Sequence, residues 1–396
     1  MKEATRYVYP TVNASNSFDS RDYLDDSSQR VLLPYIQKTQ VLLNRAIERH
    51  DLNGGAEVIP SFDLGFTYNT ARLAGGFTTG MAVNWCTDIP FVPIDMTIKE
   101  CSGSVVAIDV RDTSFFTADK IKKALVKLRS AGYRFNFKSG NHFISLFRDD
   151  EWRYYLVIHS GDDGYRDNAI GVYPSDDVWY KGDVLSVYDD DGGRYLKYLV
   201  GAPAEKFINF ALDRRHALAD FHRLLADELV SNCGRVIASE TYRHYGLDSP
   251  HTAVLGTGLV YEGGDFPIFS KEGLPIVLAR PTGETRYVLI DGERRYVIPH
   301  GWGQRIKGVT SLSVSSVEKK ISIGIGKESL CYDYGYTVKL PRDIADVREF
   351  DNYSDFISGK IPFEACWNDN LIVDVRKILY PVASYRDEEE IILLWR

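Results

Sequence analysis

The chain has 396 residues, of which 44% are hydrophobic, so it can bury a large core as one large or two ordinary domains. Its formal net charge of -8 excludes a generally polyanion-binding surface, so any nucleic-acid site needs a local basic groove or bound cations. The chain has no apolar run of membrane-spanning length and no signal-peptide pattern, which predicts a cytoplasmic protein without a membrane partner.

The first predicted element is a helix. Apolar residues recur with helical spacing from Val31 to Leu43, and the stretch ends before Asn53-Gly54-Gly55. From residue 56 to residue 110 the pattern changes to short β-like runs separated by Gly, Asn, Thr and Asp. These runs are AEVIPSF, AVNWC, IPFVPID and SVVAIDV.

Two helices are predicted in the middle of the chain. Residues 117–132 begin with a threonine cap, show helical periodicity and stop at a glycine, and a second helix is expected over about residues 204–231. Further β-like runs lie between and after these helices: FKSGNHFISLF, WRYYLVIHSG, TAVLGTGLVY, LPIVLARP, TRYVLIDG, RRYVIPHG and KISIGIG. The pattern predicts the α+β class, a mixed α/β protein with most of its strands in the middle and C-terminal half.

The chain lacks internal repeats, low-complexity tracts and a Pro/Ser linker. We therefore predict one intertwined domain over residues 55–396, and an N-terminal helical extension, residues 1–54, that packs on it. The five cysteines are scattered and contain no CxxC pair, which argues against a disulfide framework and a zinc ribbon. A functional cysteine is expected to act alone.

Four of the eight histidines lie at strand ends beside glycine or in turn-rich segments: His142, His159, His251 and His300. Strand ends hold side chains rigidly at the edge of an open site, and a neighbouring glycine lets a ligand approach the backbone. Any one such histidine is more often an ordinary hydrogen-bonded imidazole. Asp95, after an apolar run, and Cys101 complete a set of N, S and O donors that suits a divalent transition metal.

These residues also carry a resemblance to a family. The stretch SGNHFISLFRDDEWRYYLVIHSGDDGYRDNAIGVY resembles the core of RtcB-type RNA ligases, whose pattern is GNHF, a strand ending in HSGSRG, and NAIG. Other segments follow in the family's order, from residue 55 to about residue 386. VIPSFDLG resembles PDVHLG, IPFVPIDMTIKECSG resembles a strand ending in DIGCG, DSPHTAV resembles a histidine before an Asn-aromatic pair, LARPTGETRYVLIDG resembles the PGSMG loop, IPHGWGQR resembles SHGAGR, and ILYPVASYR resembles the C-terminal LxPxxxxK.

The resemblance implies an RtcB-like fold, with central β-sheets flanked by helices around a metal site, and a catalytic domain over residues 55–396. It implies an enzyme of RNA repair or tRNA splicing that joins a 3′-phosphate or 2′,3′-cyclic phosphate end to a 5′-hydroxyl end, using GTP, two Mn²⁺ ions and, in some members, an archease-like activator. His300 would be the nucleophile that takes the nucleotide. The implied metal ligands are Asp95, Cys101, His142, His159 and His251, and the implied nucleotide contacts are Asn141, Thr282, Gly283, Gly301 and Arg386.

The chain departs from the family pattern at several of these positions. Cys101 lies six residues after Asp95 where the family has three, so either a three-residue insertion separates them or Glu100 is the ligand. Ser145 replaces the glutamate that reads guanine, which leaves the bound base open. Two alternatives therefore stand beside the ligase: a metal-dependent phosphoesterase or nucleotidyltransferase with another substrate, and a non-catalytic metal-binding scaffold. The other histidines considered, His216, His222 and His244, are predicted to be ordinary surface residues.

Overall fold

The computed structural model describes residues 27–50, 52–96, 99–137, 142–163, 179–190, 193–269, 273–283, 285–290, 292–301, 304–335, 338–341, 343–344, 346–347, 373–386 and 392–393. Among the described residues, 47% lie in strands and 24% in helices, so the predicted mixed class is confirmed, with a large antiparallel sheet as its main element. Among the helices that the structure describes, none combines the length and the apolar character that a membrane span requires.

The three predicted helices begin and end close to where the sequence predicts them: α1 (Ser27–Glu48), α3 (Ala118–Ser130) and α5 (Ala202–Val230). The structure adds two short helices that were not predicted, α2 (Thr70–Ala74) and the 3₁₀ helix η2 (Lys181–Asp183). The threonine cap of α3 is present, because the Thr117 side chain accepts a hydrogen bond from the Lys120 N–H. Gly132, with φ +94°, follows the end of α3 in the left-handed region that glycine tolerates. Capping and periodicity therefore suffice to predict α3.

The described strands lie on both sides of α5 along the chain, with eight before it and the others after it. They are β1 (Gly54–Gly65), β2 (Thr79–Thr87), β3 (Phe91–Pro93), β4 (Cys101–Val110), β5 (Phe143–Arg148), β6 (Tyr154–Gly161), β7 (Leu185–Tyr188), β8 (Tyr195–Val200), β9 (Gly234–Ser249), β10 (Thr252–Leu255), β11 (Thr257–Tyr261), β12 (Phe266–Ile268), β13 (Ile276–Pro281), β14 (Tyr287–Ile290), β15 (Glu293–Pro299), β16 (Gln304–Arg305), β17 (Val309–Ser315), β18 (Lys320–Ile325), β19 (Glu328–Asp333), β20 (Asp346–Val347), β21 (Val373–Tyr385) and β22 (Ile392–Leu393).

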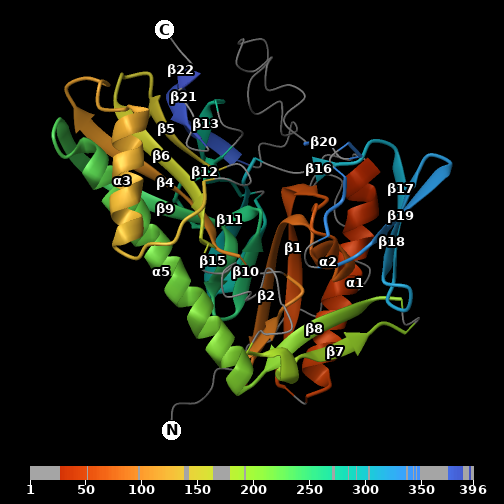
Figure 1. Ribbon diagram of the computed structural model, residues 1–396. Helices are drawn as coiled ribbons and strands as arrows, with labels where there is room; N and C mark the ends of the chain where they lie inside the picture. The colour runs from red at the N-terminus through yellow and green to blue at the C-terminus, as the bar shows by residue number, and fades with distance from the viewer. Residues whose placement is uncertain are drawn as a thin grey trace.

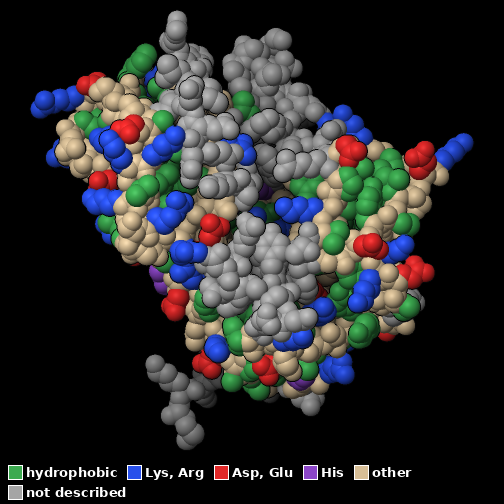
Figure 2. Space-filling model, viewed as in Figure 1, with side chains coloured by type: hydrophobic (Ala, Val, Ile, Leu, Met, Phe, Trp, Pro, Cys, Tyr) green, Lys and Arg blue, Asp and Glu red, His purple; other side chains and the backbone are tan. Residues whose placement is uncertain are grey.

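The largest sheet has eleven strands in the order β1-β2-β10-β9-β4-β6-β5-β21-β13-β12, with β22 paired to β21. Figure 1 shows α3 and α5 along the part of this sheet made by β4, β5 and β6, and α1 beside β1 and β2. The smaller sheets are β11-β15-β14, β17-β18-β19, β3-β8-β7 and β16-β20. Figure 2 shows that this face of the molecule is hollowed near its middle and that Lys and Arg side chains gather there.

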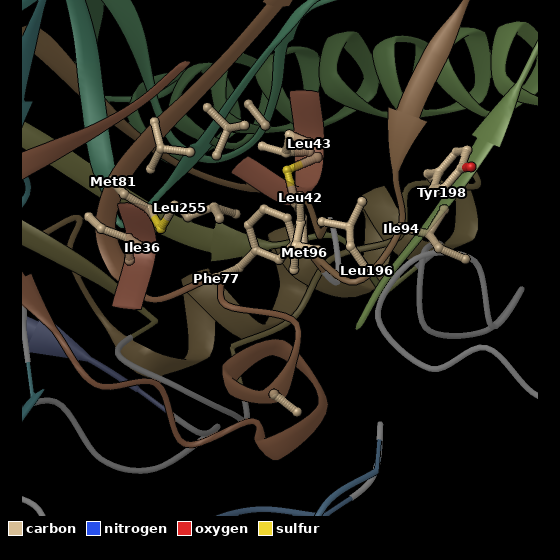
Figure 3. Close-up of a cluster of buried hydrophobic side chains, with 14 of the residues drawn as sticks. Ile36, Leu42, Leu43, Phe77, Met81, Ile94, Met96, Leu196, Tyr198 and Leu255 are labelled. Carbon is tan, nitrogen blue, oxygen red and sulfur yellow. The ribbon is translucent and has the colours of Figure 1, made fainter. Parts of the chain in front are cut away.

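Two apolar cores support the two halves of the large sheet. In the first, α1 packs against β1, β2, β8 and β10, and Figure 3 shows Ile36 and Leu43 of α1 in the same cluster as Met81 of β2 and Leu255 of β10. In the second, α3 and α5 cover one face of β4, β5 and β6. Helix α1 is thus part of a core that it shares with the sheet, and the strand ends between the two cores hold the polar residues described next.

Candidate metal centre

Four buried side chains meet at the ends of the central strands. The Cys101 sulfur lies 3.3 Å from His142 Nε2 and 3.5 Å from His159 Nε2. The donor atoms of these three residues all lie within 4.8 Å of one another, as a metal site requires. His159 Nε2 also lies 2.9 Å from His244 Nε2, so a fourth donor borders the group. One thiol and two imidazoles form the group, and the His244 imidazole beside it is a candidate fourth donor; together these are donor types that a four-coordinate transition-metal site uses.

Strand pairing explains why these residues meet. Cys101 is the first residue of β4 and pairs with Gly161 of β6 on one side and with Tyr245 of β9 on the other. His159 lies two residues before Gly161, and His244 directly precedes Tyr245. His142 directly precedes Phe143 of β5, which pairs with His159. Antiparallel register therefore brings three separate strand ends and the start of β5 to one point.

Burial sets the protonation of the group. It lowers the pKa of His142 to about 3, with further lowering by the charges of Lys99 and Arg386, and it lowers the pKa of His159 and of His244 well below the ordinary value. Burial also raises the pKa of the Cys101 thiol to about 12. The imidazoles are therefore neutral at ordinary pH and ready to donate lone pairs, whereas the thiol must release a proton to a metal ion.

Metal uptake is expected to become about tenfold tighter for each unit of pH rise between pH 6 and pH 8, because the Cys101 thiol is protonated throughout this range and binding releases its single proton. The imidazoles add no proton, since the pKa of His142 is about 3 and those of its two neighbours are also far below this range. Competition with a chromophoric chelator, corrected for the chelator's own protonation, measures this slope. The slope should flatten in Cys101→Ser, and a pH-independent affinity in the unaltered protein would exclude the thiol as a ligand.

His300 lies beside this group and is held by a carboxylate. Its ring centroid lies 5.9 Å from that of His244. Its Nδ1 lies 3.0 Å from Asp63 Oδ2, which also accepts the Gly301 N–H at 3.1 Å, and the Ser61 hydroxyl donates to Asp63 Oδ1 at 2.7 Å. Within the described part of the chain His300 Nε2 has no hydrogen-bond partner. Asp63 therefore places the proton on Nδ1 and leaves Nε2 with a free lone pair, as a nucleophile needs.

Two predicted metal ligands lie elsewhere. Asp95 follows β3, and its Oδ2 accepts the Lys197 N–H of β8 at 2.7 Å; it does not belong to the metal-capable group that the described residues form. His251 is exposed on the turn between β9 and β10, seven residues beyond His244. The structure therefore does not bring Asp95 or His251 into the group of Cys101, His142 and His159, whereas His244 of β9, which runs alongside β4, contacts His159.

Glu100, which the sequence left as an alternative metal ligand to Cys101, forms an ion pair with Arg243. Its Oε1 accepts from Arg243 Nε at 2.6 Å, and both side chains are buried. A Cβ on Gly246 would lie 2.4 Å from the other Glu100 oxygen, so the close approach of β9 requires glycine there. Cys101 is thus the residue that joins the histidines, and Glu100 lies behind it as the partner of Arg243.

The predicted nucleotide contacts are only partly brought together. Gly301 adjoins His300; it has φ +86°, and a Cβ there would lie 2.7 Å from Ile268, so glycine is needed. Arg386 lies close enough for its charge to lower the pKa of His142. Thr282 and Gly283 lie in the turn after β13, where the Thr282 N–H donates to the Thr285 hydroxyl. Asn141 lies outside the described residues.

The prediction that His222 and His244 are surface residues is wrong. Both are buried, and His244 borders the metal-capable group through its contact with His159. His222, on α5, lies between the Ser104 hydroxyl, 2.8 Å from its Nδ1, and the Ser160 hydroxyl, 2.7 Å from its Nε2. Since both ring nitrogens are occupied, His222 is a structural residue that joins α5 to β4 and β6. His216 is exposed, as predicted.

No protein-family model matches the chain, and no curated protein matches it either.

Proposed function

We propose that the chain is a metal- and nucleotide-dependent RNA-end-joining enzyme of the RtcB type, with Cys101, His142, His159 and His244 as metal ligands and His300 as the nucleophile. The observation that carries the proposal is the Asp63–His300 pair, which lies beside His244 and the buried group of Cys101, His142 and His159. A structural metal site needs no further histidine oriented by a buried carboxylate. The motif resemblance supports the ligase reading over other nucleotidyl transfers.

The chemistry follows from the state of His300. Its Nε2 lone pair attacks the α-phosphorus of a nucleoside triphosphate, a P–N bond forms and pyrophosphate leaves. An RNA 3′-phosphate oxygen then displaces the imidazole and takes the nucleotide, and a 5′-hydroxyl attacks the RNA phosphorus with release of the mononucleotide. A 2′,3′-cyclic end must first be opened by water. The bound ion would neutralise phosphate oxygens during these steps.

The types of donor atom in the group indicate which metal ion it would bind. The resemblance implies two Mn²⁺ ions, but thiolate and imidazole donors suit Zn²⁺ or Co²⁺ better than Mn²⁺, which prefers oxygen ligands. In the described residues no carboxylate joins the group, and Asp95 is bonded to the β8 backbone. We therefore propose one ion at this group, and the archease-like activator stays a prediction.

The nucleotide base is left open. Ser145, at the position of the guanine-reading glutamate, is buried and donates to the Ser384 hydroxyl at 2.7 Å. It presents no carboxylate to the two N–H groups of guanine. The proposal therefore specifies a nucleoside triphosphate, with GTP as the choice that the resemblance implies.

Incubation of the protein with GTP or ATP labelled at the α-phosphorus, in Mn²⁺, Zn²⁺ or Co²⁺, is expected to give an acid-labile adduct that His300→Ala abolishes. A phosphoramidate is labile in acid, which distinguishes it from a phosphoester. His216→Ala, on the exposed face of α5, is the matched control and should label like the unaltered protein. Failure to form an adduct with either nucleotide in any of the three metals would refute the proposed function.

A further inference from the structure

A second feature borders His300: two cations that both lie close to the ring of one tyrosine. Tyr245 follows the ligand His244 on β9, and its ring centroid lies 6.2 Å from that of His300. The Arg72 guanidinium, on α2, lies 5.0 Å from the Tyr245 ring centroid. The Lys99 ammonium lies 4.6 Å from the same centroid. Both contacts are within cation–π range, so two positive charges converge next to the proposed nucleophile.

Neither charge is neutralised by the protein. Arg72 is only 4% exposed, yet it donates to uncharged acceptors alone: the Phe77 and Thr78 carbonyls and the hydroxyls of Thr79 and Tyr245. Among the described residues no carboxylate pairs with Arg72 or Lys99, and Arg72 Nη1 and Lys99 Nζ have no hydrogen-bond acceptor. A buried guanidinium without a counter-ion is costly, so a site of this kind favours an anion from outside.

The region around Arg72 and Lys99 is therefore locally positive, in contrast to the net charge of -8 of the whole chain.

Gly256 lets Tyr245 and His300 pack closely together. It has φ +73°, and a Cβ placed on it would lie 2.6 Å from Thr79 Cγ2, 3.0 Å from the Tyr245 hydroxyl and 3.1 Å from His300 Cε1, so glycine is required there. This close packing holds the tyrosine that the two cations contact next to the proposed nucleophile.

We propose that Arg72 and Lys99 form an anion site that binds the polyphosphate of a nucleoside triphosphate next to His300. The two side chains would provide the positive charge that the resemblance assigns to a second metal ion, and they would stabilise the pyrophosphate that leaves. The role in nucleotide transfer rests on the proposed function; the binding of polyphosphate does not. Because both charges are fixed side chains, this site needs no second ion.

Calorimetric titration of the full-length protein with inorganic tripolyphosphate tests the site. Lys99→Gln is expected to weaken binding about tenfold or more, which corresponds to about 1.4 kcal/mol, and Lys99→Arg should retain most of the affinity. The control is Lys123→Gln, since Lys123 is 76% exposed and pairs with Asp119 on α3. Arg72→Gln should also weaken binding, but Arg72 is buried, so the half-buried Lys99 carries the test. Metal content is measured for every variant, because Lys99 lies near the ligand Cys101.

Equal affinity in the unaltered protein and Lys99→Gln, at equal metal content, would overturn the anion site, and so would absence of tripolyphosphate binding. A failure of the anion site can be distinguished from a failure of the proposed function. His300→Ala should bind tripolyphosphate like the unaltered protein although it forms no adduct. If the unaltered protein forms no adduct with any nucleotide but shows Lys99-dependent tripolyphosphate binding, only the proposed function fails.

Discussion

Replacing His244 with alanine is expected to lower the affinity for Zn²⁺ or Co²⁺ by at least about 100-fold, the upper end of what the loss of an outer-shell partner costs. His244 Nε2 lies 2.9 Å from His159 Nε2, so the substitution removes one of four donors and leaves an open coordination position. Elemental analysis of protein passed through a desalting column measures the change. We expect about one ion per chain in the unaltered protein and a small fraction of that in His244→Ala.

His251→Ala is the matched control, because it removes an exposed imidazole from the neighbouring turn of the same hairpin. It should keep the full metal content. The visible spectrum of the Co²⁺-loaded protein adds a second measurement, since a thiolate ligand gives an intense charge-transfer band that should persist in His251→Ala and vanish in Cys101→Ala. Normal metal content in His244→Ala together with loss of metal in His251→Ala would contradict the prediction and would mean that His251, and not His244, is the metal ligand from this hairpin.

Three of the four proposed ligands could be predicted, because Cys101, His142 and His159 lie at the ends of apolar strands. Cys101 opens the buried strand β4, His142 directly precedes β5, and His159 lies near the end of the β6 run YYLVIHSG. His244 could not be found this way. It lies on β9, whose first eight residues are mostly exposed, so that strand shows no apolar alternation and was not predicted. The missed strand explains the missed ligand.

The structure leaves Asp95 and His251 outside the group for a related reason. Closeness in sequence to an apolar run or to a strand end does not reveal which strands pair. Asp95 follows β3, which belongs to the small sheet with β8 and β7 and not to the large sheet that holds Cys101 and His159. Asp63 was overlooked for the opposite reason, because its partner His300 is 237 residues away. One signal was present: an aspartate inside the otherwise apolar run VIPSFDLG, since a buried carboxylate requires partners.

Asp63→Asn is expected to slow formation of the nucleotide adduct on His300 by about 10²- to 10⁴-fold, in line with losses seen when a carboxylate that orients a catalytic histidine is made neutral. Attack by Nε2 leaves positive charge on the ring, which the carboxylate 3.0 Å from Nδ1 stabilises. The amide has no charge in either orientation. If its NH₂ group faces the ring, it also shifts the ring proton to Nε2 and removes the attacking lone pair. The rate of label incorporation from α-labelled nucleotide measures the effect.

Ser61→Ala separates charge from orientation in this experiment. It removes one hydrogen bond to Asp63 Oδ1 but keeps the carboxylate and its bonds to His300 and Gly301. Since such a bond contributes about 1 kcal/mol, its effect on the rate should stay below about tenfold. Asn and Asp have nearly the same shape, so metal content and melting temperature should change little in Asp63→Asn. An adduct that forms at the normal rate in Asp63→Asn would show that His300 reacts without the buried carboxylate, and the pair would then be a structural feature of the β1 strand.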